Sequence, residues 1–346
     1  MSKIIIIGAG SMGTAFSIPC LDNNHDVSII GTHMEDAFID EIKKNKNFHP
    51  GLKINIPSTI NLYKFENFNS IIDSKVDIIV VAVSSKGIDW VASELIKLYK
   101  NKTLPHILIL TKGLGISNNK YEIIPDKFKK LFEIKKIKFN SISAIGGPCL
   151  AIGLANKAHT SVILANEDKK IAKKISELFK NDYYHISFTD DLSGVEICAA
   201  IKNIFSMSVG AAYGLCLKNE NLKETNYLNT ASSLITQSIF EMEFFVKHLK
   251  GKAETVYGAA GFGDLYVSST GGRNSKMGFH IGNGLTFSKA KKTKMKGITI
   301  EGADLAFEIG SKVKKDFTKD QLPLMIGMID SIIEDKKLIL NWNDFN

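Results

Sequence analysis

The stretch KIIIIGAGSMG, residues 3–13, decides the fold of the first half of the chain. Four isoleucines in a row, ended by a glycine, are typical of a strand that is buried on both faces of a parallel sheet. The glycines that follow are spaced as GxGxxG and lead into a helical pattern. This order of strand, glycine-rich turn and helix is typical of a dinucleotide-binding unit, in which the helix presents free N–H groups to a pyrophosphate.

Further apolar runs follow, separated by segments with helical spacing. They cover residues 27–30, 76–83, 106–110, 139–145 and 160–164. Strands that alternate with helices over roughly the first 185 residues predict an α/β fold with a doubly wound parallel sheet, Rossmann-like in its order, and right-handed crossovers.

The pattern changes at Gly194, after which strand-like runs nearly vanish. Apolar residues then recur at three- and four-residue spacing, as in residues 195–212 and 228–249, which predicts helices. We therefore expect two domains: a Rossmann-like dinucleotide-binding domain over residues 1–188, and an all-α domain over residues 189–346 that carries the substrate and catalytic residues.

Composition excludes several classes of site. The four cysteines form no CxxC pair, so we expect neither a zinc site nor a disulfide framework, and no metal. The net charge of +8 comes from lysines spread along the chain without a recognition motif, so we expect no nucleic-acid partner. A mild positive field of this kind suits a phosphorylated metabolite and a dinucleotide.

The sequence pattern predicts neither a membrane span nor a signal peptide. No apolar run is expected to approach the length needed to span a bilayer. Glycines interrupt the apolar start, MSKIIIIGAG, and a buried strand explains it better than a signal peptide does. We expect a cytoplasmic protein. An apolar helical second domain makes a homodimer plausible.

The glycines of the turn have separate roles in a dinucleotide site. Gly8 permits the tight turn, Gly10 lets the backbone reach the pyrophosphate, and Gly13 lets the helix pack closely on the sheet. The end of the second strand normally selects the cofactor, through an acidic residue for NAD or an arginine for NADP. Here Gly31, Thr32 and His33 are neither, and Thr32 could bond a ribose hydroxyl or a phosphate oxygen. The cofactor is therefore NAD or NADP.

A second informative stretch is GFGDLYVSSTGGRN, residues 261–274. It combines a carboxylate, Asp264, with a run of hydroxyls and a Gly-Gly-Arg-Asn turn. The guanidinium of Arg273 suits a phosphate or carboxylate in two-point contact. Together with the dinucleotide turn, this stretch indicates a redox enzyme for a small anionic substrate.

Reduction of a ketone needs a proton donor and positive potential at the developing oxyanion. Lys112 follows the strand HILIL at the carboxyl edge of the sheet, where ligands bind. Lys202 lies on a mostly apolar helical segment, where a lysine is either catalytic or extends its charged end to water. A carboxylate such as Asp264 could orient such a lysine. Cys149 has no evident histidine partner, so we expect it to line the site and not to act as a nucleophile.

These segments, in order, resemble the soluble NAD(P)-dependent sn-glycerol-3-phosphate dehydrogenase family. The resemblance rests on residues 8–15 (GAGSMGTA), 49–57 (HPGLKINIP), 111–113 (TKG), 146–148 (GGP), 194–203 (GVEICAAIKN), 261–265 (GFGDL), 271–274 (GGRN) and 301–302 (EG). It covers nearly the whole chain. It implies reversible reduction of dihydroxyacetone phosphate to glycerol 3-phosphate, which feeds phospholipid synthesis.

The resemblance also implies roles for individual residues. Lys202 would be the proton donor and acceptor, oriented by Asp264, with Lys112 beside the substrate oxygens. The implied substrate contacts are Lys112, Gly147, Ser268, Arg273 and Asn274, of which the last two hold the phosphate. The implied cofactor contacts are Gly8, Gly10, Ser11, Met12, Gly13, Thr32, Lys112, Ala151, Arg273 and Glu301.

The chain departs from the family pattern at Met12, Thr32, Cys149–Leu150, Gly153 and Gln237–Ser238. These departures leave two alternatives open. One is a dehydrogenase of another small phosphorylated or carboxylated hydroxy compound. The other is a regulator that binds the dinucleotide without turnover, against which the retained polar residues argue.

Overall fold

The computed structural model describes residues 1–73, 75–217 and 227–345. The chain forms two compact units. The first unit comprises Met1–Lys112 and Ile124–Leu192, and the second unit comprises Gly113–Ile123 and Ser193–Asn346. The chain thus enters the second unit early, through a hairpin of β9 (Leu114–Ser117) and β10 (Lys120–Ile123).

The first unit is built on an eight-stranded sheet with the order β14-β13-β12-β8-β6-β1-β2-β5. Its strands are β1 (Lys3–Ile7), β2 (Asp26–Ile30), β5 (Asn61–Tyr63), β6 (Ile78–Val81), β8 (His106–Ile109), β12 (Ile142–Gly146), β13 (Thr160–Ala165) and β14 (Tyr184–Thr189). The six strands from β5 to β12 are parallel throughout. The predicted doubly wound α/β fold is confirmed.

One ladder departs from the parallel prediction: β13 runs antiparallel to β12. The helix between them, α6 (Ala151–Ala155), has five residues and spans only about 7 Å. Because this is shorter than a strand, it does not return the chain to the start of the sheet, and β13 begins beside the end of β12. The longer α7 (Lys169–Phe179) makes the full return, and β14 is parallel to β13.

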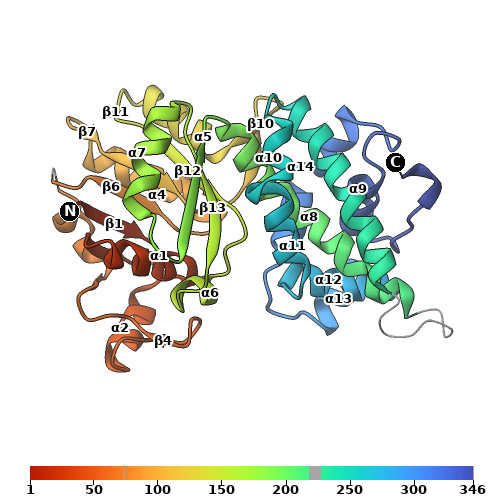
Figure 1. The fold of residues 1–346 in the computed structure, drawn as a ribbon, viewed down its shortest axis with the longest axis horizontal. Coiled ribbons are helices and arrows are strands. Elements are labelled where there is room, and N and C mark those ends of the chain that lie inside the picture. Colours follow the sequence, from red (N-terminus) through yellow and green to blue (C-terminus); the bar gives the residue numbers. More distant parts are fainter. Residues whose placement is uncertain (74, 218–226, 346) are drawn as a thin grey trace. The chain divides into compact units, whose positions relative to one another are not determined.

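Helices cover both faces of this sheet (Figure 1). The helices α1 (Ser11–Asp22) and α7 lie on one face, and α4 (Ile88–Leu98) and α5 (Ile124–Ile134) lie on the other. The remaining elements of the first unit are α2 (Asp36–Lys44), α3 (Phe68–Ile71), β3 (Phe48–His49), β4 (Ile54–Asn55), β7 (Thr103–Leu104) and β11 (Lys138–Phe139). Because both faces are covered, the isoleucines of β1 from Ile4 to Ile7 are fully buried, as their unbroken apolar run predicts.

The second unit is helical apart from the β9–β10 hairpin, and no described residue after Thr189 is in a strand. Its helices are α8 (Leu192–Cys216), α9 (Tyr227–His248), α10 (Ala253–Tyr257), α11 (Asp264–Ser269), α12 (Arg273–Gly282), α13 (Phe287–Thr293), α14 (Glu301–Asp316) and α15 (Pro323–Ile333). A π-helical turn, Ala259–Gly263, leads into α11.

The expectation that no apolar stretch reaches the length of a membrane span needs correction for α8. This helix is long and apolar enough to cross a membrane by length and composition alone. However, 89% of its most apolar window is buried inside the protein. Small and polar residues such as Ser193 and Lys202 interrupt its apolar run, so α8 does not stand out in the sequence.

Candidate active site

The glycine-rich turn between β1 and α1 has the shape that a dinucleotide requires. Gly8 adopts a positive φ of 112°, and a Cβ there would lie 2.7 Å from the carbonyl oxygen of Ala82. Gly13 presses α1 against the turn, since a Cβ there would overlap the carbonyl oxygen of Gly8. Above Gly10, in contrast, a Cβ would meet nothing within 4 Å. The turn is therefore tightly packed at Gly8 and Gly13 and leaves open space next to Gly10.

The N-terminus of α1 opens onto the same space. Its first N–H groups belong to Ser11, Met12 and Gly13, and no side chain of the described residues caps them. Uncapped N–H groups at the positive end of a 12-residue helix favour a bound anion. The residues present therefore fit the pyrophosphate of a dinucleotide.

Two side chains absent from the sequence-based site hold this turn. The first is Glu35, whose Oε2 accepts hydrogen bonds from the backbone N–H of Ala9 at 3.3 Å and of Thr32 at 2.8 Å. One carboxylate thus ties the turn to the end of β2. Glu35 lies outside residues 31–33, where the usual pattern places the acid, because it stands further on, immediately before α2.

The second is His49, which lies in β3 and is buried. Its Nδ1 accepts a hydrogen bond from the backbone N–H of Leu52 at 3.2 Å, so Nε2 carries the proton that is donated to the carbonyl oxygen of Ala9, also at 3.2 Å. Burial lowers the pKa of His49, which favours this neutral form. The segment HPGLKINIP, which begins with this histidine, thus supports the dinucleotide turn.

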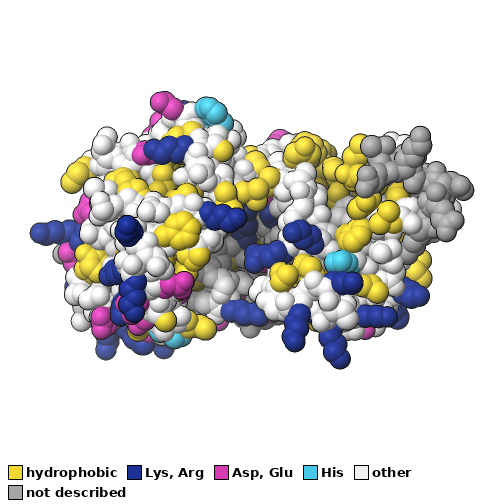
Figure 2. Space-filling model, turned by 90° about the horizontal axis from the view of Figure 1, so that it is seen from below, with side chains coloured by type: hydrophobic (Ala, Val, Ile, Leu, Met, Phe, Trp, Pro, Cys, Tyr) yellow, Lys and Arg dark blue, Asp and Glu magenta, His cyan; other side chains and the backbone are white. Residues whose placement is uncertain are grey.

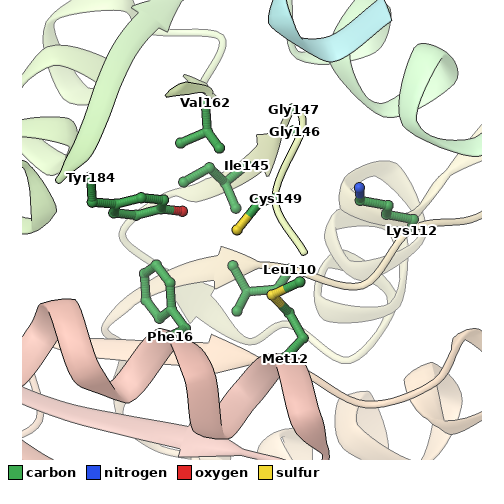
Figure 3. A pocket seen from close by; sticks show the side chains of 10 residues that line it. All are labelled: Met12, Phe16, Leu110, Lys112, Ile145, Gly146, Gly147, Cys149, Val162 and Tyr184. Carbon is green, nitrogen blue, oxygen red and sulfur yellow. The ribbon is translucent and has the colours of Figure 1, made fainter. Parts of the chain in front are cut away.

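An apolar pocket lies at the carboxyl ends of β8 and β12 (Figure 3). It has an empty volume of about 320 Å³, part of it open to solvent. Its lining comprises Met12, Phe16, Leu110, Lys112, Ile145, Gly146, Gly147, Cys149, Val162 and Tyr184. The structure thus brings together Met12, Lys112 and Gly147, three of the sequence-predicted site residues.

Cys149 is one of the residues that line this pocket. Its sulfur points inward, as does the hydroxyl of Tyr184 (Figure 3), and no histidine is among the lining residues. A thiol needs a neighbouring base such as histidine to act as a nucleophile, so this lining supports a role for Cys149 as a wall of the pocket. Ala151, which begins α6, follows two residues later in the chain.

The second unit contains a buried cluster of three sequence-predicted residues. The Nζ of Lys202, on α8, donates to Oδ1 of Asp264 at 2.5 Å and to Oγ of Ser268 at 2.6 Å. Lys202 is 6% exposed and Asp264 is 2% exposed. Asp264 and Ser268 stand four residues apart on α11, so they share one face of that helix. The ammonium of Lys202 is therefore held at a fixed place by a carboxylate and a hydroxyl.

A second group lies at two helix N-termini of the same unit. Arg273, the first residue of α12, forms an ion pair with Glu301, the first residue of α14. Asn274 accepts a hydrogen bond from the backbone N–H of Gly302 at 3.0 Å and donates to Oδ1 of Asn203 at 3.0 Å. Because Asn203 follows Lys202 directly, Asn274 ties the arginine end of α12 to the helix that carries the buried lysine.

Arg273 of this group is the single arginine in the sequence, among 44 lysines and arginines. Lysine cannot offer two parallel N–H donors to a phosphate, whereas a guanidinium can. Its position at an exposed helix N-terminus therefore marks a place suited to an oxyanion.

The described residues on the face seen in Figure 2 form no separate basic patch that would indicate another anion-binding site. Lys and Arg side chains are spread over that face, with hydrophobic and uncharged side chains between them. They form no continuous basic stripe there. This distribution fits the mild positive field inferred from the net charge.

Comparison with known families matches nearly the whole chain. The sequence model of the NAD-dependent glycerol-3-phosphate dehydrogenase N-terminus matches residues 3–172. The model of the C-terminus of the same family matches residues 191–340.

Individual relatives agree with this match. The glycerol-3-phosphate dehydrogenase [NAD(P)+] of Mesoplasma florum is 30% identical over 358 residues, which cover 98% of this chain and all of the relative. The NADP(+)-dependent glycerol-3-phosphate dehydrogenase of Archaeoglobus fulgidus is 28% identical and covers 90% of this chain and 91% of its own. Among solved structures, glycerol-3-phosphate dehydrogenase from Coxiella burnetii is 26% identical with a TM-score of 0.78, covering 97% of this chain and 96% of its own.

Proposed function

The chain belongs to the NAD-dependent glycerol-3-phosphate dehydrogenase family, and we infer that it is an oxidoreductase that reversibly reduces dihydroxyacetone phosphate to sn-glycerol 3-phosphate with NADH or NADPH. The observation that best supports this function at the level of side chains is the buried contact of Lys202 with Asp264 and Ser268. The comparisons do not favour the alternative of a different hydroxy compound.

We assign the chemistry of the substrate oxygen to Lys202. When bound, the reduced nicotinamide supplies the hydride for the ketone carbon. The ammonium of Lys202 holds the carbonyl oxygen, stabilises the negative charge that develops on it and gives it a proton. Asp264 and Ser268 fix the direction of the ammonium, so that no reorientation is needed as the charge develops. In the reverse reaction, the neutral amine of Lys202 takes the proton back.

We assign the phosphate of the substrate to Arg273 and Asn274. The phosphate would replace the Glu301 carboxylate as the partner of the Arg273 guanidinium, and two parallel N–H donors would fix its orientation. Glu301 would then be released toward the cofactor, which matches the role that the resemblance implies for it. Lys112 and Gly147 complete the proposed substrate contacts.

Most of the proposed contacts of the dinucleotide lie in the first half of the chain, within the domain predicted over residues 1–188. The open space above Gly10 and the uncapped N-terminus of α1 support this. The remaining proposed contacts of the cofactor are Ser11, Met12, Thr32, Lys112, Ala151, Arg273 and Glu301. We further propose a cytoplasmic homodimer without a nucleic-acid partner, whose product supplies glycerophospholipid synthesis; light scattering tests the dimer.

The test is a steady-state assay with dihydroxyacetone phosphate, run in parallel with NADH and NADPH. Turnover with at least one cofactor is expected, and its absence with both would refute the function. Lys202→Ala should lower kcat by about 100-fold or more while KM changes little. The exposed Lys276→Ala, three residues after Arg273 on α12, is the matched control and should leave both constants near their wild-type values.

A further inference from the structure

The carboxylate of Glu35 lies between the dinucleotide turn and the end of β2. Its Oε2 accepts from the backbone N–H groups of Ala9 and Thr32. Within the described residues, no hydrogen bond falls on Oε1. Glu35 is partly buried and stands just before α2. The chain therefore presents an acidic oxygen at the junction of the turn and the second strand, although that strand itself ends in neutral residues.

The lysine at the end of the neighbouring strand pairs with a different carboxylate. Tyr63 of β5 pairs with Ile30 of β2, so Lys64 is the cation of the neighbouring strand end. Its Nζ is engaged by Asp40 of α2 at 2.6 Å. Since the chain's single arginine is Arg273, none stands in the first half of the chain to receive a phosphate.

The neighbouring side chains are equally unsuited to a phosphate. The ring of His33 packs against Trp90, with ring centroids 5.0 Å apart, and also contacts Phe65. The backbone N–H of Thr32 is used by Glu35. In folds of this type, an acid at this junction bonds the adenine ribose hydroxyl of NAD, and an arginine accommodates the 2′-phosphate of NADP.

We propose that Glu35 selects NAD(H) over NADP(H), by accepting a hydrogen bond from the 2′-hydroxyl of the adenine ribose and repelling a 2′-phosphate. This rests on the proposed function only in requiring that a dinucleotide binds at the turn. Glu35 is thus a specificity residue that touches the cofactor far from its reacting end. The preference sets this chain apart from the relative of Archaeoglobus fulgidus, whose name gives NADP(+).

Calorimetry on the whole protein tests the proposal without any turnover. Three probes are titrated: ADP, 2′-deoxy-ADP and 2′-phospho-ADP, which is ADP with a further phosphate on the 2′-oxygen. A hydrogen bond to a charged group accounts for roughly tenfold to hundredfold in affinity. We expect ADP to bind at least about tenfold tighter than either of the other two probes. NADH and NADPH should follow the same order in equilibrium binding.

Two variants separate charge from shape. Glu35→Gln keeps the size and an acceptor oxygen but removes the charge, so it should bind the 2′-phosphate probe about tenfold tighter than wild type does. Glu41→Gln removes one charge from the exposed face of the same helix, α2, and should leave the order of the probes unchanged. Circular dichroism and thermal melting of both variants check that the turn still folds.

The outcomes distinguish this proposal from the function. Equal or tighter binding of NADPH by the wild-type protein would overturn the proposal, as would a probe order that Glu35→Gln leaves unchanged. If NADH is preferred but dihydroxyacetone phosphate is not reduced, the function fails and the cofactor proposal stands. If the ketone is reduced equally well with both cofactors and both bind equally, the function stands and the proposal fails. Should Glu35→Gln not fold, the comparison of ADP with the 2′-deoxy and 2′-phosphate probes on the wild-type protein decides alone.

Discussion

Separate and combined removal of the charges of Lys202 and Asp264 should have unequal effects. We predict that Lys202→Met and Asp264→Asn each lower the free energy of unfolding by about 3–5 kcal/mol. The double variant should lose about 2–3 kcal/mol less than the sum of the two single losses. The asymmetry arises because each single variant leaves one ion buried without its counter-ion, whereas the double variant leaves none.

The magnitude follows from the separation and the burial. At the 2.5 Å between Nζ and Oδ1, two unit charges attract by about 7 kcal/mol at an effective dielectric constant of about 20. Removing each ion from water costs several kcal/mol, and both residues are less than a tenth exposed. Attraction and desolvation therefore nearly cancel for the intact pair. Each single variant keeps the desolvation cost of one ion, and in Asp264→Asn the remaining bond of Lys202 to Ser268 reduces that cost.

Urea unfolding followed by far-UV circular dichroism measures all four proteins of this cycle, with the free energies extrapolated linearly to water. The control cycle uses Lys97 and Glu94, which pair at a similar 2.6 Å, but with the lysine side chain 67% exposed. Each control variant should cost less than about 1 kcal/mol. The reasoning is refuted if the Lys202 and Asp264 variants cost as little as the controls, or if the two single losses simply add.

Other predictions concern the phosphate, the turn and the response to acid. Arg273→Lys keeps the charge but loses the two-point contact, so KM for dihydroxyacetone phosphate should rise about tenfold or more in the steady-state assay, with a smaller change in kcat. His49→Phe removes both hydrogen bonds of the ring and should lower the affinity for NADH about fivefold to tenfold in calorimetry. If His49 had only a structural role, the melting temperature would fall without this loss of affinity. Burial lowers the pKa of His106 to about 4. Since the neutral ring is favoured in the fold, this contribution, about 3 kcal/mol, is present above pH 6.5 and is lost as the pH falls toward 4. Urea midpoints over this range should therefore fall less steeply for His106→Gln than for wild type, and equal slopes would contradict the assignment.

The parts of the fold that could be predicted are those with long, unmixed patterns. The isoleucines of β1 and the GxGxxG turn specify one strand, one turn and one helix together, because all three patterns agree. The strands β3 and β4 have two residues each, which is too few for any periodicity. The β9–β10 hairpin packs on α14, nearly 200 residues later in the chain, and local sequence carries no record of such a partner.

The site shows the same division. Asp264 could be placed beside a lysine because a carboxylate suits a buried ammonium and the family resemblance names Lys202. The bond of Lys202 to Ser268 could not be predicted, because it depends on the helix α11 that puts Asp264 and Ser268 on one face. Glu35 and His49 could not, because neither occupies the position that the usual pattern specifies. The acid stands before α2 instead of at the end of β2, and the histidine approaches from a short hairpin. Each acts through a backbone group of Ala9, and backbone partners leave no trace in the identity of Ala9.

The single arginine gives the strongest link between composition and chemistry in this chain. Every other basic position that is not histidine is a lysine, so elsewhere the chain satisfies its need for positive charge with a flexible ammonium. At position 273 an ammonium would keep the charge and still pair with Glu301, yet the residue is arginine. What lysine cannot supply there is the planar pair of donors that fixes the orientation of a phosphate. Because hydride transfer depends on the angle at which the ketone is held, orientation at the phosphate end affects the reacting carbon several bonds away. Because the first half of the chain has no arginine, the charged side chain that we propose to contact the adenine ribose is the carboxylate of Glu35. One compositional bias therefore bears on both proposed ligand contacts: Arg273 is the one arginine that could hold the phosphate of the substrate, and the first half of the chain offers no arginine to the 2′-phosphate of NADP.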